Sequence, residues 1–477
     1  MRARSSGVLG WRHAVDASAT LLLVGGGRVI LYELNEVPWV IVDRFVRLEP
    51  RSALASLLGR CATATTVNDD PVHLQPWRTW PTFHTGLYAA DHGSMELGQD
   101  PGTFRGEPIW EAVERAGRTV GLFGVMQTWP ARAPANGGFW VPDTFARNAS
   151  AYPEELETFQ RFNLSMTAEN STSSNAPLDA RRMISAGGDM MRRGLRPGSA
   201  AAIVRHLARE RRDSRWKAAR PMLQVLPSFD LYWRLHRRVQ PDLSIFFTNH
   251  VAGMMHRYWG DAVDEYSQEH EYDRDEIFAT FLDEAMRKFD RQLATIVDFV
   301  DGRDDTTLLI ASSMGQGAVP YRHIGKCYVL RDPDALRRAL DLPESEPGLA
   351  MHPHHSFRYR EPEMAERAAA ALQPVQLNGA PLFKSVDLAG TTVSLELNQF
   401  VGEGTVHLRN GSSSGSDVSD LARIGVVVEE RLGGGNTAYH IPEGIWLAHG
   451  PRTVADPSRE RFSVLDAKAR VLDLMGV

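Results

Sequence analysis

Three histidines, His250, His256 and His440, are residues of this sequence that could carry out chemistry together. His250 and His256 lie in FFTNHVAGMMHRYWGD, and on one continuous helix they would point in different directions. They converge if His250 ends a strand and His256 lies on the following helix. Zinc commonly takes three protein ligands and leaves a position for water or substrate. We interpret the three histidines as candidate metal ligands, against the alternative that each is an ordinary, partly buried polar residue.

Oxygen donors follow the apolar run RVILYEL, where Asn35 and Glu36 come directly after Leu34. Such donors beside a strand end can hold a metal ion, and a carboxylate can also act as acid or base. Alternatively, they cap the turn that follows the strand. We therefore take Asn35 and Glu36 as further candidate metal ligands.

Hydroxyl groups are concentrated in QPWRTWPTFHTGLYAADHG, which contains Thr79, Trp80 and Thr82. A threonine that opens a helix can cap it through its side chain. The same place suits an attacking hydroxyl, because the amide groups at a helix N-terminus attract a phosphoryl group. Thr79 is the candidate nucleophile. Trp80 and Thr82, together with Ser313 in LLIASSMGQ, are candidate substrate contacts.

The elements that must position these residues alternate between strand and helix. Apolar, β-branched runs occur near residues 30, 122, 245 and 309, and segments with helical spacing lie between them. This order predicts an α/β fold with a mostly parallel central sheet and helices on both faces. Ligands of such sheets gather at the carboxyl ends of the strands, which is where the candidate residues lie.

The sequence divides into a short tail and one large domain. Residues 1–27 predict a flexible N-terminal tail, and residues 28–477 the domain. The polar and then basic stretch 147–240 predicts a helical insertion that caps the substrate pocket. Shorter alternating runs with glycines predict an α+β portion over residues 341–460.

Composition excludes several classes of function. Hydrophobic residues make up 43% of the 477 residues, charged residues 23%, and the net charge is -6, so a nucleic-acid polymer is not an expected partner. The apolar run of residues 20–24 is too short to span a membrane. Cys61 and Cys327 have neither disulfide-framework nor metal-site spacing, which favours a cytoplasmic location. The oligomeric state does not follow from the sequence.

Taken together, these segments resemble the alkaline phosphatase superfamily, in its type I phosphodiesterase and nucleotide pyrophosphatase branch. Thr79-Trp80-Pro81 followed by TFHTGLYAADHG is similar to the family's nucleophile segment. YHIPEGIWLAHGP is similar to its His-x-Pro-Glu-Gly signature, and SVLDAKARVLDLMGV to its closing helix. The resemblance implies an alkaline phosphatase-like fold, a threonine nucleophile and a pair of metal ions, usually zinc.

The sequence departs from this family in the residues that would bind one of the two metals. The family's Ser-Asp-His-Gly is Ser312 to Gly315 here, with Ser313 and Met314 at the places of the ligands. The family's first-strand Asp falls on Asn35 or, with a small shift, on Glu33 or Glu36. The neutral Ser and the thioether Met bind a hard dication poorly. We therefore expect a degenerate site that holds one divalent cation, zinc, at His250, His256 and His440.

Two functions remain open at this point. The first is a metal-dependent phosphoesterase-like hydrolase or phosphoryl transferase that acts on a small-molecule phosphodiester with Thr79 as nucleophile. The alternative is a catalytically degenerate family member that binds an anionic ligand or a partner protein.

Overall fold

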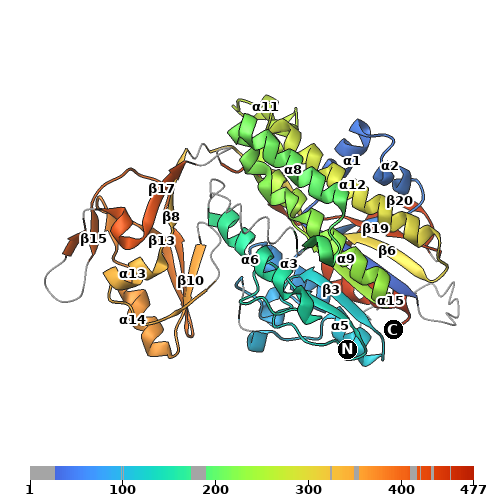
Figure 1. Ribbon diagram of the computed structural model, residues 1–477, viewed down its shortest axis with the longest axis horizontal. Helices are drawn as coiled ribbons and strands as arrows, with labels where there is room; N and C mark the ends of the chain where they lie inside the picture. Colours follow the sequence, from blue (N-terminus) through green and yellow to red (C-terminus); the bar gives the residue numbers. More distant parts are fainter. Residues whose placement is uncertain are drawn as a thin grey trace, which may run out of the picture.

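The chain folds into a larger and a smaller lobe in this computed structural model (Figure 1). The smaller lobe lies on the left of Figure 1 and is formed by one stretch of the C-terminal half. The structure describes residues 27–477 with the exception of 98, 100, 173–187, 189, 323–324, 349–353, 409–415, 419, 431–434 and 452. Nearly all of the predicted flexible tail, residues 1–26, lies outside the described residues.

The larger lobe is built on an eight-stranded, mostly parallel sheet, as predicted. Its strand order is β20-β2-β19-β6-β1-β5-β3-β4, and β19 alone runs antiparallel to its two neighbours, β2 and β6. The strands are β1 (Arg28–Leu34), β2 (Ala62–Val67), β3 (Val120–Val125), β4 (Gly138–Pro142), β5 (Leu243–Thr248), β6 (Thr306–Ala311), β19 (Trp446–His449) and β20 (Asp456–Ser463). β1 lies between β5 and β6, so the carboxyl ends of these three strands meet at one edge of the sheet.

Helices bury both faces of this sheet, which explains why the strands read as continuous apolar runs. Ile30 and Tyr32 of β1 belong to the core on one face, and Val29 and Leu31 belong to the core on the other. The first face is covered by α1 (Trp39–Leu48), α2 (Ala53–Leu58), α9 (Val225–Val239), α10 (His250–Ala262) and α12 (Ala279–Asp301). The second is covered by α3 (Pro76–Thr85), α5 (Ile109–Arg115) and α15 (Ala467–Met475).

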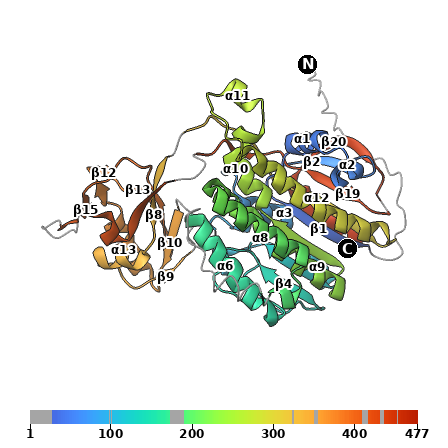
Figure 2. The same cartoon turned by 45° about the horizontal axis from the view of Figure 1, so that its top comes forward.

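The chain between β4 and β5, for which the sequence predicts a helical cap, contains several helices. They are α6 (Glu157–Thr172), α8 (Pro197–Arg212), the 3-10 helix η3 (Ser214–Leu223) and α9. Tyr232 of α9 stacks on Phe246 of β5 with 4.6 Å between ring centroids. Figure 2 shows α8, α9 and α12 side by side over the sheet. α9 is thus part of the layer that covers the sheet face.

The smaller lobe has a hydrophobic core of its own, which includes Tyr328, Phe357 and Val393. It begins with β8 (Lys326–Leu330) and ends with β17 (Val426–Glu430), and these two strands pair antiparallel. This pairing places the boundaries of the lobe at 326 and 430, whereas the α+β portion predicted from the sequence covers residues 341–460. Between these strands lie α13 (Pro333–Ala339), α14 (Pro362–Leu372), β9 (Glu346–Pro347), β10 (His354–Arg358), β11 (Gln376–Leu377), β12 (Ala380–Pro381), β13 (Phe383–Ala389), β14 (Thr392–Leu397), β15 (Val406–Leu408) and β16 (Ser416–Val418).

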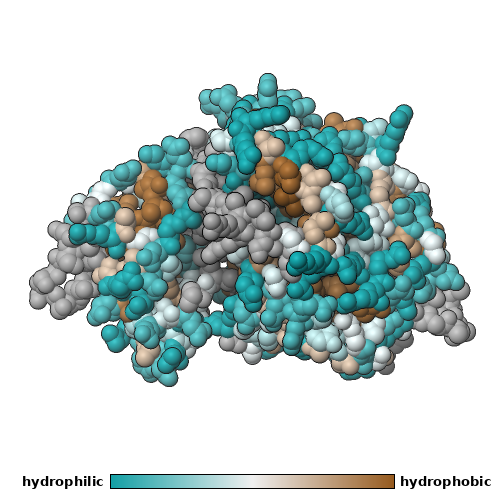
Figure 3. Space-filling view, viewed as in Figure 1, coloured by the Kyte–Doolittle hydropathy of each residue, from teal (hydrophilic) through white to brown (hydrophobic). Residues whose placement is uncertain are grey.

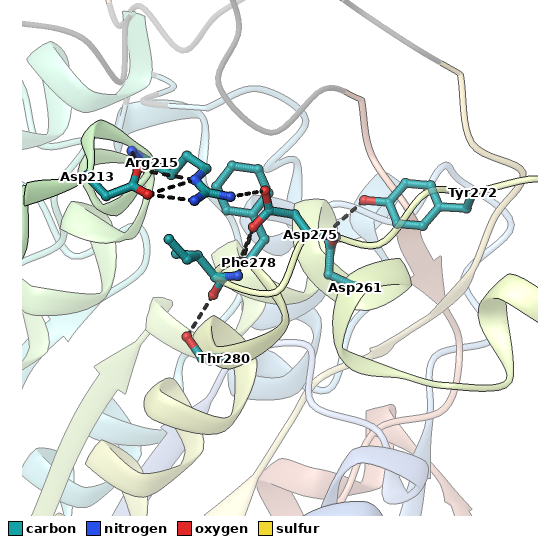
Figure 4. Close-up of polar contacts among 8 residues, drawn as sticks. Asp213, Arg215, Asp261, Tyr272, Asp275, Phe278 and Thr280 are labelled. Atoms are coloured by element: carbon teal, nitrogen blue, oxygen red, sulfur yellow. Dashed lines mark hydrogen bonds and ion pairs between the residues drawn. The ribbon is translucent and has the colours of Figure 1, made fainter.

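A buried carboxyl group anchors the segment between α10 and α12, which includes α11 (Tyr266–Glu269) (Figure 4). Asp261 accepts hydrogen bonds from the Tyr272 hydroxyl and the Asp275 amide, each at 2.8 Å. The Asp275 carboxylate in turn pairs with Arg215, which also binds Asp213. Burial raises the pKa of Asp261 to about 6.

Hydrophilic side chains cover most of the face shown in Figure 3, and apolar side chains form separate patches on it. Among the described residues, no helix is both long enough and apolar enough to cross a membrane. Cys61 is buried and Cys327 is half-buried, and the two are not joined by a disulfide.

Candidate metal centre

The carboxyl ends of β1, β5 and β6 bring together residues that are far apart in the sequence. Asn35 and Glu36 follow β1, Asn249 follows β5, and Ser313 follows β6. A short two-stranded sheet, β7 (Gly315–Ala318) with β18 (Ala438–Ile441), adds His440, which pairs with Gln316 across the strands.

Glu36, His256 and His440 form the centre of this arrangement. One ligand atom of each residue lies within 4.8 Å of the other two. Nε2 of His256 is 3.0 Å from Glu36 Oε2, and Nε2 of His440 is 3.5 Å from the same oxygen. The Glu36 carboxyl group is buried, and the His256 side chain is the most exposed of the three, at 23%.

The other ring nitrogens fix which tautomer each histidine adopts when neutral. Nδ1 of His256 lies 3.1 Å from the Ala438 carbonyl oxygen, and Nδ1 of His440 lies 2.8 Å from that of Leu74. A carbonyl oxygen only accepts, so each Nδ1 must carry the hydrogen. The two Nε2 lone pairs of the neutral rings then face a carboxylate oxygen. This contact is favourable only when the nitrogens are protonated or a cation lies between the three groups.

The distances fit a shared cation. Two ligands bound to one zinc ion at about 2.0 Å with a tetrahedral angle are roughly 3.3 Å apart. The two nitrogen to oxygen distances, 3.0 and 3.5 Å, lie on either side of that value. One carboxylate and two imidazoles are a ligand set that suits a divalent transition metal, and three protein ligands leave a fourth position open.

Neighbouring side chains orient the Glu36 carboxylate. Nδ2 of Asn35 donates to Oε1 at 2.9 Å, and Nε2 of Gln316 donates to Oε2. Glu36 itself has a backbone φ of 61°, a left-handed conformation that is costly for a residue with a side chain. Burial alone would raise the pKa of Glu36, but the charges of His440 and His256 hold that pKa well below its ordinary value. The Glu36 charge raises the pKa of His440 against the opposing effect of burial.

His250 does not join this group, so the predicted set of three imidazoles is corrected to Glu36, His256 and His440. α10 begins at His250, so both histidines lie on one helix and point to different sides of it. The His250 ring is buried close to Ala285 and Lys288 of α12, and burial followed by the Lys288 charge lowers its pKa to about 3. Its two ring nitrogens have no hydrogen-bond partner among the described residues.

Asn35, predicted as a ligand, instead uses its whole amide group to hold its neighbours. Its Oδ1 accepts from the Trp80 indole nitrogen at 2.8 Å, and its Nδ2 donates to Glu36 and to Asn249. Gln316 and Asn249 were not predicted from the sequence. Gln316 could have been found because it directly follows the strand-end glycine Gly315. Asn249 could have been found because it directly precedes His250.

Thr79 lies in the first half of α3 and contacts Ser313. Their hydroxyl oxygens are 2.8 Å apart, and Thr79 is 2% exposed. The Thr79 amide donates to the Gln75 carbonyl, so it is not free to bind a phosphoryl group. The two predicted substrate contacts in the same helix lie in the interior: Trp80 and Thr82 are both 0% exposed.

A buried ion-pairing contact attaches α3 to β1 beside these residues. His84 Nε2 lies 2.6 Å from Glu33 Oε1, and both side chains are at most 1% exposed. Glu33 Oε2 and His84 Nδ1 have no hydrogen-bond partner among the described residues. Together with the Trp80 to Asn35 bond, this contact fixes the rotation of α3 against the sheet.

Comparison with known proteins gives one family match. A family model described as type I phosphodiesterase / nucleotide pyrophosphatase matches residues 75–384. That range includes Thr79, His256 and Ser313, while Glu36 and His440 lie outside it. A search of curated proteins finds no match.

Two solved structures are similar to the chain at low identity. Murine ectonucleotide pyrophosphatase/phosphodiesterase 5, an inactive variant in complex with AMP, is 11% identical, with 94% of this chain and 95% of that chain covered and a TM-score of 0.39. The human ectonucleotide pyrophosphatase/phosphodiesterase 5 is 12% identical, with the same coverage and the same TM-score.

Proposed function

Because this chain belongs to the type I phosphodiesterase / nucleotide pyrophosphatase family, we propose that it is a metal-dependent phosphoesterase-like hydrolase or phosphoryl transferase. Its proposed substrate is a small-molecule phosphodiester. The observation that carries this proposal is the convergence of Glu36, His256 and His440, with both Nε2 atoms directed at one carboxylate oxygen.

These three residues would hold one zinc ion, which would polarise a phosphoryl oxygen when bound. Gln316 and Asn35 hold the Glu36 carboxylate in place, and the Ala438 and Leu74 carbonyls hold the two imidazole rings. Such outer contacts commonly matter about 10- to 100-fold for metal affinity or activity.

Thr79 is the proposed nucleophile, and Ser313 is its partner. Either hydroxyl can donate in their contact, so Ser313 can accept a hydrogen bond from Thr79 and leave the lone pairs of the Thr79 oxygen available. Attack by Thr79 would form a bond from Oγ1 to phosphorus and break the bond from phosphorus to the ester oxygen. That oxygen would leave as the alcohol of the substrate and carry the proton that Thr79 loses.

The burial of Thr79 favours a second candidate function. At 2% exposed, its hydroxyl meets a phosphodiester only if the surrounding side chains move. A family member that binds an anionic ligand without turnover keeps the metal centre and has no need of an exposed hydroxyl. This candidate predicts metal binding with no hydrolysis.

Metal analysis of the purified full-length chain distinguishes the ligand set with Glu36 from the alternative set with His250. After incubation with zinc and removal of the excess, we expect about one ion per wild-type chain and a loss of metal in Glu36→Gln and His256→Ala. His250→Ala tests the alternative set and is expected to keep its metal. Wild-type protein without bound metal would defeat the proposal.

Hydrolysis of bis(4-nitrophenyl) phosphate then distinguishes the two functions. We expect turnover by the wild type and none by Thr79→Ala. The matched control is Thr295→Ala, at a half-buried threonine of α12. Activity that survives in Thr79→Ala would remove the nucleophile assignment. Metal binding without any turnover would establish the non-catalytic candidate.

We propose a cytoplasmic location, because Cys61 and Cys327 have no disulfide-framework spacing in the sequence. Fractionation of the producing cells tests it, and recovery of the protein outside the cytoplasm would contradict it.

A further inference from the structure

Asn249 occupies a distinctive place at the rim of the metal centre. It connects β5 to α10, and unlike most residues around it the side chain is exposed. Its backbone lies at φ -119° and ψ 7°, close to the sparsely populated region in which many active-site residues are found. It is the N-cap residue of α10, yet its side chain makes no cap hydrogen bond. An asparagine at this position usually uses its oxygen to cap the helix, so here that oxygen serves another contact.

A chain of three hydrogen bonds fixes the orientation of the Asn249 amide. The Trp80 indole nitrogen can only donate, so the atom of Asn35 that it contacts at 2.8 Å must be Oδ1. Asn35 therefore presents Nδ2 on its other side, where it contacts Asn249 at 2.7 Å. Because Nδ2 donates, the contacted atom of Asn249 must be its Oδ1. The Asn249 Nδ2 group is left as the free end of this chain.

The free end lies beside the metal centre. The same Asn35 Nδ2 donates one hydrogen to Asn249 and the other to Glu36 Oε1, so a single nitrogen connects Asn249 to a proposed ligand. Within the described part of the chain, Asn249 Nδ2 has no hydrogen-bond partner of its own. An exposed amide donor, held at its oxygen end next to a cation site, suits an anionic oxygen of a bound ligand.

We propose that Asn249 is a substrate-binding residue whose Nδ2 donates a hydrogen bond to a phosphoryl oxygen of a ligand at the Glu36, His256 and His440 centre. This inference rests on the proposed function. Asn249 would thus select ligands that carry a tetrahedral oxyanion. Trp80 and Asn35 would act as positioning residues that hold the Asn249 side chain in place.

Asn249→Asp is the sharpest test, because the substitution keeps an oxygen for Asn35 and replaces the donor at the free end by a negatively charged acceptor. The assay is the affinity of the zinc-loaded full-length protein for inorganic phosphate, measured by calorimetry and as inhibition of any diesterase activity. A hydrogen bond to a charged group corresponds to a loss of about 10- to 100-fold in phosphate affinity. Asn398→Asp, in the smaller lobe, is the matched control and is expected to leave the affinity unchanged.

Zinc content is measured for every variant, so that two failures are told apart. Zinc-free wild-type protein would overturn the proposed function and this inference with it. Asn249→Asp protein that holds one zinc and binds phosphate within twofold of wild type would overturn this inference alone, as would zinc-loaded wild type that does not bind phosphate. Asn249→Ser, which keeps a helix-capping side chain, serves as the second variant if the Asp variant does not fold, and the same tenfold or greater loss is expected.

Discussion

Replacing Asp261 by Asn should stabilise the larger lobe at neutral pH. Asp261 is completely buried, and its carboxyl group accepts from the Asp275 amide and the Tyr272 hydroxyl (Figure 4). Asn keeps the shape and one acceptor oxygen, and the Tyr272 hydroxyl can accept from the new amide instead of donating. The substitution therefore resembles the protonated form of Asp261.

The size of the expected gain in free energy of unfolding follows from the pKa of Asp261. Burial raises the pKa of Asp261 from an ordinary value of 3.8 to about 6, so the folded chain binds this proton more tightly than the unfolded chain does. Stability from this group is fully present below the unfolded value and is lost as the pH rises through 6. The loss amounts to about 3 kcal/mol at pH 7 and to about half of that at pH 5. Asp261→Asn should recover it.

Urea unfolding followed by tryptophan fluorescence measures this effect in the larger lobe alone, because all 11 tryptophans lie outside residues 326–430. We expect the variant to exceed the wild type in free energy of unfolding by about 3 kcal/mol at pH 7, and by less at pH 5. A variant that is less stable at pH 7 would contradict this expectation, because it means that the folded protein stabilises the ionised carboxylate. An advantage that is the same at both pH values would also contradict it, because it means that folding does not raise the pKa of Asp261.

Three further predictions use the same fluorescence assay. His84→Leu leaves the buried Glu33 carboxyl group without its partner and should lower the free energy of unfolding by about 3–5 kcal/mol. Adding Glu33→Leu should restore most of this stability. Equal stability of the single and double variants would contradict the prediction. Trp80→Phe leaves the buried Asn35 Oδ1 without a donor and should cost about 1–3 kcal/mol, and an unchanged unfolding midpoint would argue against the hydrogen bond. Zinc at 100 times its Kd should stabilise the wild type by about 2.7 kcal/mol and leave Glu36→Gln unaffected, whereas equal stabilisation of both would place the ion elsewhere.

The sheet could be predicted from the sequence because its central strands are buried on both faces. RVILYEL corresponds to β1, Arg28–Leu34, and the runs near residues 122, 245 and 309 contain β3, β5 and β6. The boundaries of the smaller lobe were harder to predict. Its first strand, β8, has five residues, and it is recognised by its pairing with β17, about one hundred residues later in the chain.

The ligand set was only partly predictable because it depends on directions that the sequence does not encode. His256 and His440 converge as predicted. The prediction for His250 required it to lie at the end of the strand, before the helix begins. α10 instead begins at His250, so His250 and His256 point to different sides of one helix. Glu36 reaches the two imidazoles with a left-handed backbone that a glutamate rarely adopts, so sequence preference gives no indication of it.

The most direct test of the central claim is anomalous diffraction at the zinc edge from crystals of the zinc-loaded protein. We expect one peak at bonding distance, about 2 Å, from Glu36 Oε2 and from Nε2 of His256 and His440. A peak at His250, or no peak among these three side chains, would contradict it.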